Sequence, residues 1–299
     1  MSSEGTILCI GEVLWDVFPT GEFLGGAPMN VAYHLHALGQ PALIASRIGR
    51  DELGERTLER MSQLGLSPTL VQQDPSLPTG RVLVDLTEPS APRYDIHHPA
   101  AWDAIEFSPD LQSVARQARA IVFGSLAQRD DESRKTIRDA LDTAPATALR
   151  VFDINLRPPY DKPGVVADGL QFTDLLKLND VELDVLRGWF QLPAGDKQAV
   201  EALAKRFECP SICVTRGDKG ATLLHEGEHY QSAGYRVKLA DPVGAGDAFL
   251  AALLNGLLQS HEPAASLDEA CALGAFVASQ PSATPRHDRE RIEAIRRSQ

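Results

Sequence analysis

Short apolar segments alternate with amphipathic ones along most of the chain. A strand buried on both faces appears as a continuous apolar run of about four to eight residues. The sequence has such runs at 6–10, 42–47, 120–125, 150–154, 175–178 and 211–215. Apolar residues at helical spacing mark the segments 28–38, 51–64, 131–141, 248–258 and 271–279. This alternation predicts an α/β fold with a mostly parallel sheet between two helical layers, a three-layer α/β/α sandwich.

Other segments have the looser alternation of half-exposed strands. Residues 13–18 and 80–86 mix apolar and polar side chains, and each is followed by a loop that contains proline. Residues 221–225 and 229–232, joined by Glu226-Gly227-Glu228, have the pattern of a β-hairpin. We therefore expect further strands that each keep one face exposed.

The composition fits a single α/β domain over residues 1–299, because 43% of the chain is hydrophobic and can form a large core. Lys and Arg number 29 against 41 Asp and Glu, and the net charge of −12 argues against nucleic acid or a membrane surface as partner. The apolar run 248–258 is too short to span a bilayer, and the N-terminus lacks the features of a signal peptide. We expect a cytoplasmic protein with free buried thiols at Cys9, Cys209, Cys213 and Cys271.

The segment Asp241-Pro242-Val243-Gly244-Ala245-Gly246-Asp247 precedes the predicted helix 248–258. Glycines permit unusual backbone angles and close approach to a ligand. Backbone N–H groups at the start of a helix attract anions, most often phosphate. A carboxylate at Asp247 conflicts with an anion site unless it takes a proton from a hydroxyl that attacks the bound phosphoryl group. The alternative is that Asp247 only caps the helix.

Polar residues also occur in unexpected places near the N-terminus. Asp16 lies among apolar residues, either because it binds a ligand or because it points outward from an edge strand. Gly25-Gly26 allows a ligand to approach the backbone, and Asn30 offers both a donor and an acceptor near the start of a helix. Asn30 as a helix cap is the alternative.

Asp153 and Arg157 come at the end of the predicted strand 150–154. Ligands of open α/β sheets lie beyond the carboxyl ends of the strands, so these side chains are candidates for a binding site. A surface ion pair is the alternative for Arg157. The adjacent Pro158-Pro159 favours a binding role, because prolines rigidify the loop.

Several motifs, in this order, resemble those of the ribokinase-like (PfkB) carbohydrate kinases. They are Gly11-Glu12 with Asp16, Gly25–Gly39, Gly49–Gly54, Asp153–Arg157, Asn179–Glu182, Thr215–Gly220, Asp241–Asp247 and Ala278–Pro285. The resemblance implies a ribokinase-like fold and transfer of the γ-phosphate of ATP to a small sugar. It assigns general base catalysis to Asp247 and an anion hole to the amides of Gly244, Ala245 and Gly246. It assigns sugar binding to Asp16, Gly25, Gly26 and Asn30, and contact with the acceptor or phosphates to Arg157.

The same resemblance implies a nucleotide site at Asn179, Thr215, Gly217 and Gly220. Glu182 would organise Mg²⁺ through water, which is consistent with the water shell that Mg²⁺ retains in proteins. Asp241 would belong to a loop that holds a monovalent cation in many relatives. Ser282 replaces a glycine near that loop, and a Cβ is costly if the backbone there needs a positive φ. We therefore expect activation by potassium to be weak or absent.

A small β-sheet lid over the sugar is also implied, formed by residues of about 12–25 and 80–98. Such a lid would keep water from competing with the sugar hydroxyl. Val82 and Val84 place apolar side chains on this short sheet, and an isolated small sheet is marginally stable in water. We therefore expect a homodimer through the lid.

Among the subfamilies, the Gly11-Glu12, Asp16 and Asp153–Arg157 patterns look most like bacterial fructokinases. Fructose would be phosphorylated on its primary hydroxyl. Kinases of 2-keto-3-deoxygluconate share much of the pattern and are the main alternative, and a catalytically silent sensor of sugar or nucleotide is a more distant one. His97-His98 stands where many relatives have a Tyr-Arg pair, and it is either substrate-facing or exposed loop. An already phosphorylated acceptor would need two or more cations, and the lid candidates are Arg81 and Arg93 with the two histidines. An acid substrate needs fewer, so Arg93 with His97 could serve it.

Overall fold

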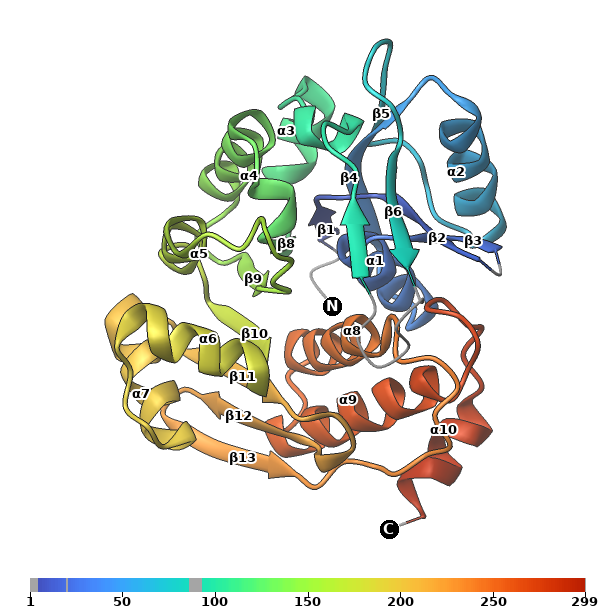
Figure 1. Cartoon of the computed structure of the whole chain (residues 1–299). Coiled ribbons are helices and arrows are strands. Elements are labelled where there is room, and N and C mark those ends of the chain that lie inside the picture. The colour runs from blue at the N-terminus through green and yellow to red at the C-terminus, as the bar shows by residue number, and fades with distance from the viewer. Residues whose placement is uncertain (1–4, 20, 86–92, 299) are drawn as a thin grey trace.

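Continuous apolar runs form the strands of a large central sheet (Figure 1). The computed structural model describes residues 5–19, 21–85 and 93–298, and residues 84, 85, 93 and 94 by their backbone alone. In the described part the sheet has nine strands in the order β13-β12-β11-β10-β9-β8-β1-β4-β5. Their bounds are β1 Ile7–Ile10, β4 Ala42–Gly49, β5 Val71–Asp74, β8 Ala120–Gly124, β9 Leu149–Asp153, β10 Leu175–Asn179, β11 Ser211–Thr215, β12 Ala221–His225 and β13 Glu228–Ser232. All neighbours from β11 to β5 pair in parallel, whereas β12 and β13 form an antiparallel hairpin.

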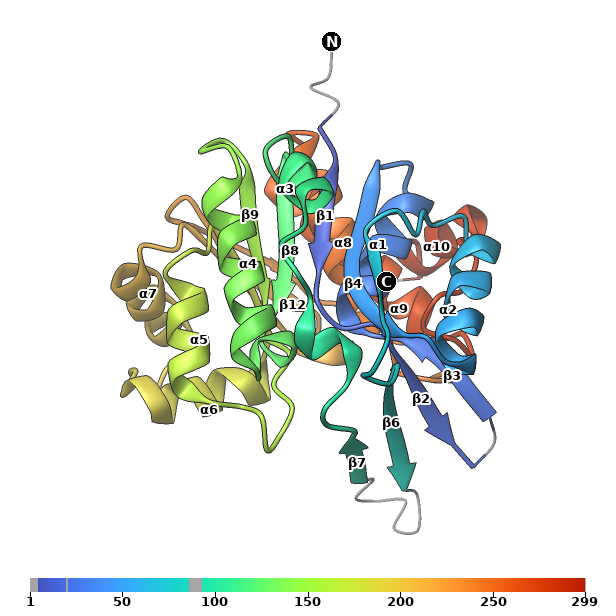
Figure 2. The same cartoon turned by 90° about the horizontal axis from the view of Figure 1, so that it is seen from above.

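Helices cover both faces of this sheet, which confirms the predicted three-layer arrangement (Figures 1 and 2). One face packs against α3 Pro109–Ala115, α4 Asp131–Thr143, α5 Pro163–Leu170, α6 Asp180–Phe190 and α7 Asp196–Phe207. The other face packs against α1 Ala27–Ala37, α2 Glu52–Gln63, α8 Ala245–Leu258, α9 Pro263–Ala278 and α10 Arg289–Arg296. Along β1, Leu8 and Ile10 enter the first core, and Ile7 and Cys9 enter the second. Because both faces of such a strand are buried, its sequence does not alternate between apolar and polar residues.

The order of the strands reverses at β1. The chain passes from β1 to β4 and β5 on one side, and then to β8, β9, β10 and β11 on the other. A crevice beyond the carboxyl ends of the strands at such a reversal is the usual ligand site of open α/β sheets. The loops that follow β1, β8 and β9 therefore mark the expected position of the site.

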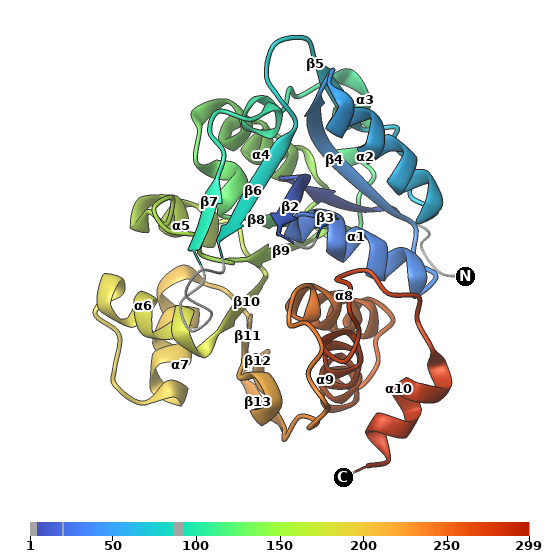
Figure 3. The same cartoon turned by 45° about the vertical axis from the view of Figure 1, so that its right-hand side comes forward.

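A second sheet has the strand order β3-β2-β6-β7 and projects beyond one end of the main sheet, away from the N-terminus (Figures 2 and 3). It consists of β2 Leu14–Phe18, β3 Gly21–Gly25, β6 Gly80–Asp85 and β7 Arg93–Ile96, which lie within the segments predicted for the lid. Paired residues share a face, so Asp16 lies on the same face as Phe23 and Val82. Val82 is buried within the chain. The expectation that Val82 needs a partner subunit to cover it is therefore wrong, and Val84 lies outside the described side chains.

Asp51 anchors the segment that leads into β6. Its carboxylate caps α2 by accepting from the Gly54 amide at 2.8 Å, as the sequence predicts. The same carboxylate accepts from the Thr79 amide at 2.8 Å and from the Thr79 hydroxyl at 2.6 Å. Thr79 also accepts from the Gly49 amide at 2.9 Å. The lid strand β6 therefore starts from a point that is fixed to both β4 and α2.

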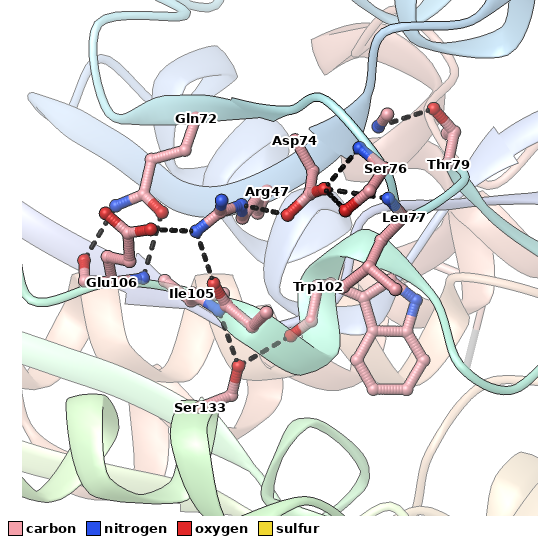
Figure 4. A network of polar contacts seen from close by, with 12 residues as sticks. Arg47, Gln72, Asp74, Ser76, Leu77, Thr79, Trp102, Ile105, Glu106 and Ser133 are labelled. Atoms are coloured by element: carbon pink, nitrogen blue, oxygen red, sulfur yellow. Dashed lines mark hydrogen bonds and ion pairs between the residues drawn. The ribbon is translucent and has the colours of Figure 1, made fainter.

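Arg47 on β4 organises a second anchor nearby (Figure 4). Its guanidinium pairs with Asp74 at 2.8 Å and with Glu106 at 2.6 Å, and it donates to the Ala104 carbonyl at 2.8 Å. Asp74 in turn accepts from the Ser76 and Leu77 amides at 2.8 and 2.7 Å. The chain just before β6 is therefore held in place by local hydrogen bonds, and the lid extends from a rigid base.

Among the described residues, no helix is long and apolar enough to cross a membrane.

Candidate active site

The turn before α8 requires glycine at position 244. The helix begins at Ala245, earlier than the predicted start at 248, and Gly244 is its N-cap with a φ of 79°. A Cβ on Gly244 would also lie 2.7 Å from the Cα and Cβ of Ala283. Gly246 is helical, so its glycine has a different cause: a Cβ there would lie 3.1 Å from the Nζ of Lys177.

The amides predicted to form the anion hole lie in this turn. The Ala245 amide donates to the Pro242 carbonyl at 3.3 Å, so it already has a partner within the chain. The first N–H groups of a helix lack partners inside the helix and carry the positive end of its dipole. The turn at Gly244–Gly246 therefore has the features of an anion site, and its use for a phosphoryl group stays a prediction.

Asp247 lies in the first turn of α8 and is buried. Its Oδ2 accepts a hydrogen bond of 2.8 Å from the Nδ2 of Asn30 on α1. Burial raises the pKa of Asp247 to about 6, and the charge of Asp153 raises it further, whereas Lys177, Asn30 and Arg157 oppose this rise. The carboxylate is therefore ionised at neutral pH with a basicity suited to general base catalysis.

Asp16 lies on β2 beside Gly25 on β3. A Cβ on Gly25 would lie 2.7 Å from the Asp16 Oδ2, so the glycine leaves the space that the carboxylate needs. Burial raises the pKa of Asp16 to about 6, while the charge of Arg157 lowers it and those of Asp241 and Asp247 raise it. Asp16 thus belongs to the same electrostatic cluster as Asp247, and it does not point outward into solvent.

Gly26 is needed for two separate reasons. Its φ is 108°, and a Cβ would lie 2.3 Å from the Glu12 carbonyl oxygen. Glu12 is itself buried and has one carboxylate oxygen, Oε2, without a hydrogen-bond partner. Burial raises the pKa of Glu12 to about 7, and Asp247 adds to the rise while Arg157 and backbone amides oppose it. The motif that contains Glu12 predicted no separate role for this residue.

Arg157 is exposed in the loop after β9, and its Nη1 donates to the Leu156 carbonyl at 2.9 Å. Its charge lowers the pKa values of Glu12, Asp16 and Asp247. Among the described residues Arg157 forms no ion pair within 4 Å, so the alternative of a surface ion pair has no partner there. Its binding role stays a prediction.

A cavity of about 230 Å³ opens between the lid and the loops that carry Asp241 and Ser282. A cavity needs only about 10–15 Å³ on this measure to hold one water molecule. Its lining includes Asp16, Phe18 and Phe23 from the lid. Asp241 is half-buried, and its Oδ1 accepts from the Val243 amide at 2.9 Å. The cavity has the size and the polar lining expected for a small polyol.

The structure removes the reason given for weak potassium activation. Ser282 is not among the described non-glycine residues that have a positive φ. The strain that its Cβ was expected to cause is therefore absent, because any residue adopts a negative φ without cost.

Asn179 and Thr215, both predicted for the nucleotide, are paired neighbours at the carboxyl ends of β10 and β11. Gly217 and Gly220 follow with φ values of 57° and 81°. A Cβ on Gly220 would lie 2.0 Å from the Ser232 carbonyl oxygen, so that position requires glycine. These loops lie along the same edge of the sheet as Arg157, as a shared site requires.

Glu182 has a structural role that the sequence analysis did not name. It forms a capping box with Asn179: each backbone amide donates to the other's side chain at 2.8 Å. The remaining oxygen, Oε1, accepts from the Leu156 amide at 2.9 Å. Both carboxylate oxygens hold backbone amides and the residue is buried, an arrangement that favours contact with a metal ion through bound water over direct coordination.

His98 is exposed, and its Nε2 lies 2.8 Å from the Oδ2 of Asp130. Arg129 donates to the His97 carbonyl at 2.8 Å. Arg81 pairs with Trp15 in the lid register, on the face opposite Asp16. The side chain of Arg93 lies outside the described residues. In the described part of the chain, neither His98 nor Arg81 is among the residues that line the cavity.

The family model "pfkB family carbohydrate kinase" matches residues 8–289 of this chain. The chain belongs to this family. A fructokinase of Rhizobium leguminosarum bv. trifolii is 30% identical over 88% of this chain and 84% of its own length. The fructokinase of Escherichia coli is 29% identical over 83% of each chain. The family is one of phosphotransferases that act on sugars, and this carbohydrate kinase is an enzyme of that class.

Solved structures show the same fold. The fructokinase of Xylella fastidiosa with bound ATP matches with a TM-score of 0.86 at 22% identity, over 98% of both chains. The fructokinase of Vibrio cholerae O395 in a form bound to fructose, ADP and calcium ion matches with a TM-score of 0.85 at 23% identity, over 98% of this chain and 99% of its own. The predicted ribokinase-like fold with its β lid is therefore confirmed.

Lys177 is the main residue of this carbohydrate kinase that the sequence analysis missed. It lies on buried strand β10 and pairs with Asp153 at 2.9 Å. The signal was available, because a lysine inside an apolar strand is almost never buried without a partner. The contact of Asn30 with Asp247 had no such signal, since 217 residues separate the two.

Proposed function

We propose that this kinase transfers the γ-phosphate of ATP to the primary hydroxyl of fructose and forms fructose 6-phosphate. The observation that carries this proposal is the buried carboxylate of Asp247, which is held by Asn30 at the start of α8. A carboxylate in that place is unfavourable for a plain anion site and useful for deprotonating a hydroxyl that attacks a phosphate. The Rhizobium and E. coli fructokinases named above support fructose as the acceptor.

In this mechanism Asp247 takes the proton of the sugar hydroxyl as the new oxygen–phosphorus bond forms. The bond between the γ-phosphorus and its bridging oxygen breaks, and ADP leaves. The amides of Gly244, Ala245 and Gly246 and the positive end of α8 would stabilise charge on the transferred group. Arg157 adds a positive charge at the same place, as its effect on the site carboxylates indicates.

ATP would lie along the loops of Asn179, Thr215, Gly217 and Gly220. Mg²⁺ supplies neutralisation of phosphate charge when bound. The donor set fits such a hard ion, and outer-shell contact is favoured because Glu182 is buried and both of its oxygens accept from backbone amides. Mg²⁺ held through water, with Glu182 in its outer shell, is therefore the arrangement that we propose.

The cavity favours a neutral polyol. Asp16 offers acceptors, and Asn30 has one buried oxygen, Oδ1, that still lacks a partner. An acidic sugar would need cations in the cavity. Of the described residues that line it, Arg60 is the one cation, and it lies there with the acidic Asp16, Glu22 and Asp241. Arg81 and His98 are not part of the lining, and His98 is paired with Asp130. A site built for particular hydroxyls strongly rejects substrates that leave those groups unpaired. Fructose is therefore favoured over 2-keto-3-deoxygluconate.

The test is the ratio of kcat/KM for fructose and for 2-keto-3-deoxygluconate under identical ATP and Mg²⁺. We expect fructose to be preferred, and Arg81→Ala to leave the ratio unchanged because Arg81 does not line the cavity. If the sugar acid is preferred by about tenfold, roughly 1.4 kcal/mol of transition-state preference, the fructose assignment is wrong and the kinase assignment stands.

A further inference from the structure

Lys177 and Asp153 form a buried ion pair whose two charges act on the proposed base, Asp247. They are paired neighbours in the register of β9 and β10, close to the carboxyl ends of both strands. The Lys177 Nζ lies 2.9 and 3.1 Å from the two Asp153 oxygens. Lys177 is 7% exposed and Asp153 is 3% exposed. A pair as buried as this is costly to form and seldom adds stability over apolar residues, so a role outside stability must be sought.

The ammonium of Lys177 also lies against the first turn of α8. A Cβ on Gly246 would lie 3.1 Å from Nζ, closer than side chains ordinarily pack. Gly246 has ordinary helical geometry, so it has no conformational need to be glycine. The space beside its Cα is required for Lys177. The ion pair therefore packs closely against the turn that carries Asp247.

The charges around Asp247 come from every element packed against it. Asp153 on β9 disfavours the Asp247 carboxylate, and Lys177 on β10 favours it. Asn30 on α1 and Arg157 in the loop after β9 also favour it. Glu12 after β1 and Asp16 on β2 are further acidic groups that interact with Asp247. Lys177 is the buried cation in this set, since Arg157 is exposed.

We propose that Lys177 is a positioning residue for Asp247: it offsets the charge of Asp153 and supports the first turn of α8 through Gly246. This inference rests on the proposed function, in which Asp247 is the base. Burial disfavours the ammonium, but the charges of Asp153, Glu182 and Asp247 outweigh burial and raise the pKa of Lys177. Lys177 thus remains charged throughout the working range of the enzyme and never acts as an acid or base itself.

The decisive test follows the Asp247 carboxyl directly, by carbon NMR of protein labelled at the aspartate carboxyl carbon. Loss of one signal in Asp247→Asn assigns the resonance. The wild type should titrate with a pKa of about 6. Lys177→Gln should raise the midpoint by about one unit or more, and Asp153→Asn should lower it by a similar amount. The double variant should return to within about half a unit of the wild type.

A merely structural ion pair predicts a different outcome. Both single variants would then lose thermal stability, but the midpoint of Asp247 in the folded protein would stay where it is. Midpoints that do not move, or that move in the same direction in both single variants, overturn the proposal. This readout needs no turnover, so it holds whether or not the chain phosphorylates fructose.

Kinetics and a glycine substitution add independent readouts. In Lys177→Gln the acidic limb of kcat should move to higher pH, with roughly fivefold lower kcat near pH 6 and little change in KM for the sugar.

Gly246→Ala should lower the melting temperature, although alanine normally stabilises a helix. Gly188→Ala on α6 is the matched control, because no atom lies within 4 Å of its Cβ position, and it should raise the melting temperature. A stabilised Gly246→Ala would contradict the contact with Lys177, whereas a wild type without sugar-dependent turnover would refute only the proposed function.

Discussion

Three acidic residues of the site have pKa values above their ordinary range because burial disfavours their charged forms. They are Glu12 at about 7, and Asp16 and Asp247 at about 6. At neutral pH Asp16 and Asp247 are charged, and burial of these charges lowers the stability of the fold. Arg157 partly offsets this loss, as does Lys177 for Asp247. This is the usual conflict between stability and activity at a functional site. It leads to a prediction about Asp16.

We predict that the free energy of unfolding of Asp16→Asn, relative to that of the wild type, is higher at alkaline pH than at acidic pH. The folded-state pKa of Asp16 is raised from 3.8 to about 6. Its protonated form therefore stabilises the fold below pH 3.8, and this contribution is lost as the pH rises through 6. Asparagine does not ionise, so the free energy of unfolding of the variant, relative to that of the wild type, should increase between about pH 4 and about pH 8. Urea denaturation at both pH values measures the gain.

Asp196→Asn is the matched control for this prediction. The hydrogen bond from Arg216, together with the one from Arg187, outweighs burial and lowers the pKa of Asp196. Its charged form stabilises the fold above the ordinary pKa of 3.8, and this contribution is lost as the pH falls below that value. The stability of Asp196→Asn relative to the wild type should therefore change little between about pH 4 and about pH 8. Equal pH dependence in the two variants would show that burial of Asp16 does not control its ionisation.

At the scale of elements, local pattern predicted the strands of the main sheet better than the helices. The helices α3, α5, α6, α7 and α10 were not predicted, and α9 begins at Pro263 and not at 271. The bounds of β11 are those expected, and β1, β9 and β10 differ by a residue at one end or both. The predicted elements omitted β5, whose residues Val71-Gln-Gln-Asp74 are mostly polar. Its pairing with β4 supplies the stability that its own sequence lacks. Tertiary contacts of this kind override local propensity and leave no local signal.

The candidate site was predicted by resemblance more than by pattern. Asp16, Asn30 and Asp247 do come together, and Arg157 acts on their charges. The reasons for the glycines were only partly foreseen, since the space required by Asp16 and Lys177 depends on contacts between distant strands. The capping role of Glu182, in contrast, could have been inferred from Asn-x-x-Glu alone.

We predict that Glu182→Ala destabilises the fold by about 2 kcal/mol, from the lost cap and two unpaired backbone amides. The amides are those of Asn179 and Leu156. Urea denaturation in the absence of nucleotide and metal measures the loss. Glu201→Ala on α7, an exposed surface position, is the control and should change stability little. Unchanged stability in Glu182→Ala, with weaker Mg²⁺ dependence alone, would mean that the residue serves only the metal.

At the scale of the whole molecule, the lid exposes apolar surface on both faces. Phe23 is 47% exposed on the face of Asp16, and Leu83 is 45% exposed on the opposite face. A small sheet with such exposure is marginally stable alone. We propose that a second copy of this chain covers the lid, as the sequence analysis expected, although through these side chains and not through Val82.

The prediction is a homodimer in light scattering that weakens in the double variant Phe23→Ser with Leu83→Ser. Removing buried apolar area at an interface lowers affinity. The matched control is Val181→Ser on α6, which replaces a side chain that is 68% exposed on a different surface. It should leave the dimer intact. A wild type that remains monomeric at working concentrations would refute the dimer.

The most direct test of the account is fructose-dependent formation of ADP by Asp247→Asn, compared with the wild type near neutral pH. Asparagine keeps the size of the side chain and removes its ability to take a proton. If Asp247 is the base of a sugar kinase, kcat should fall by roughly two to four orders of magnitude, while the affinity for ATP, measured by calorimetry, should change little. Turnover close to that of the wild type would contradict the central claim, because the buried carboxylate at the start of α8 would then have no part in the chemistry.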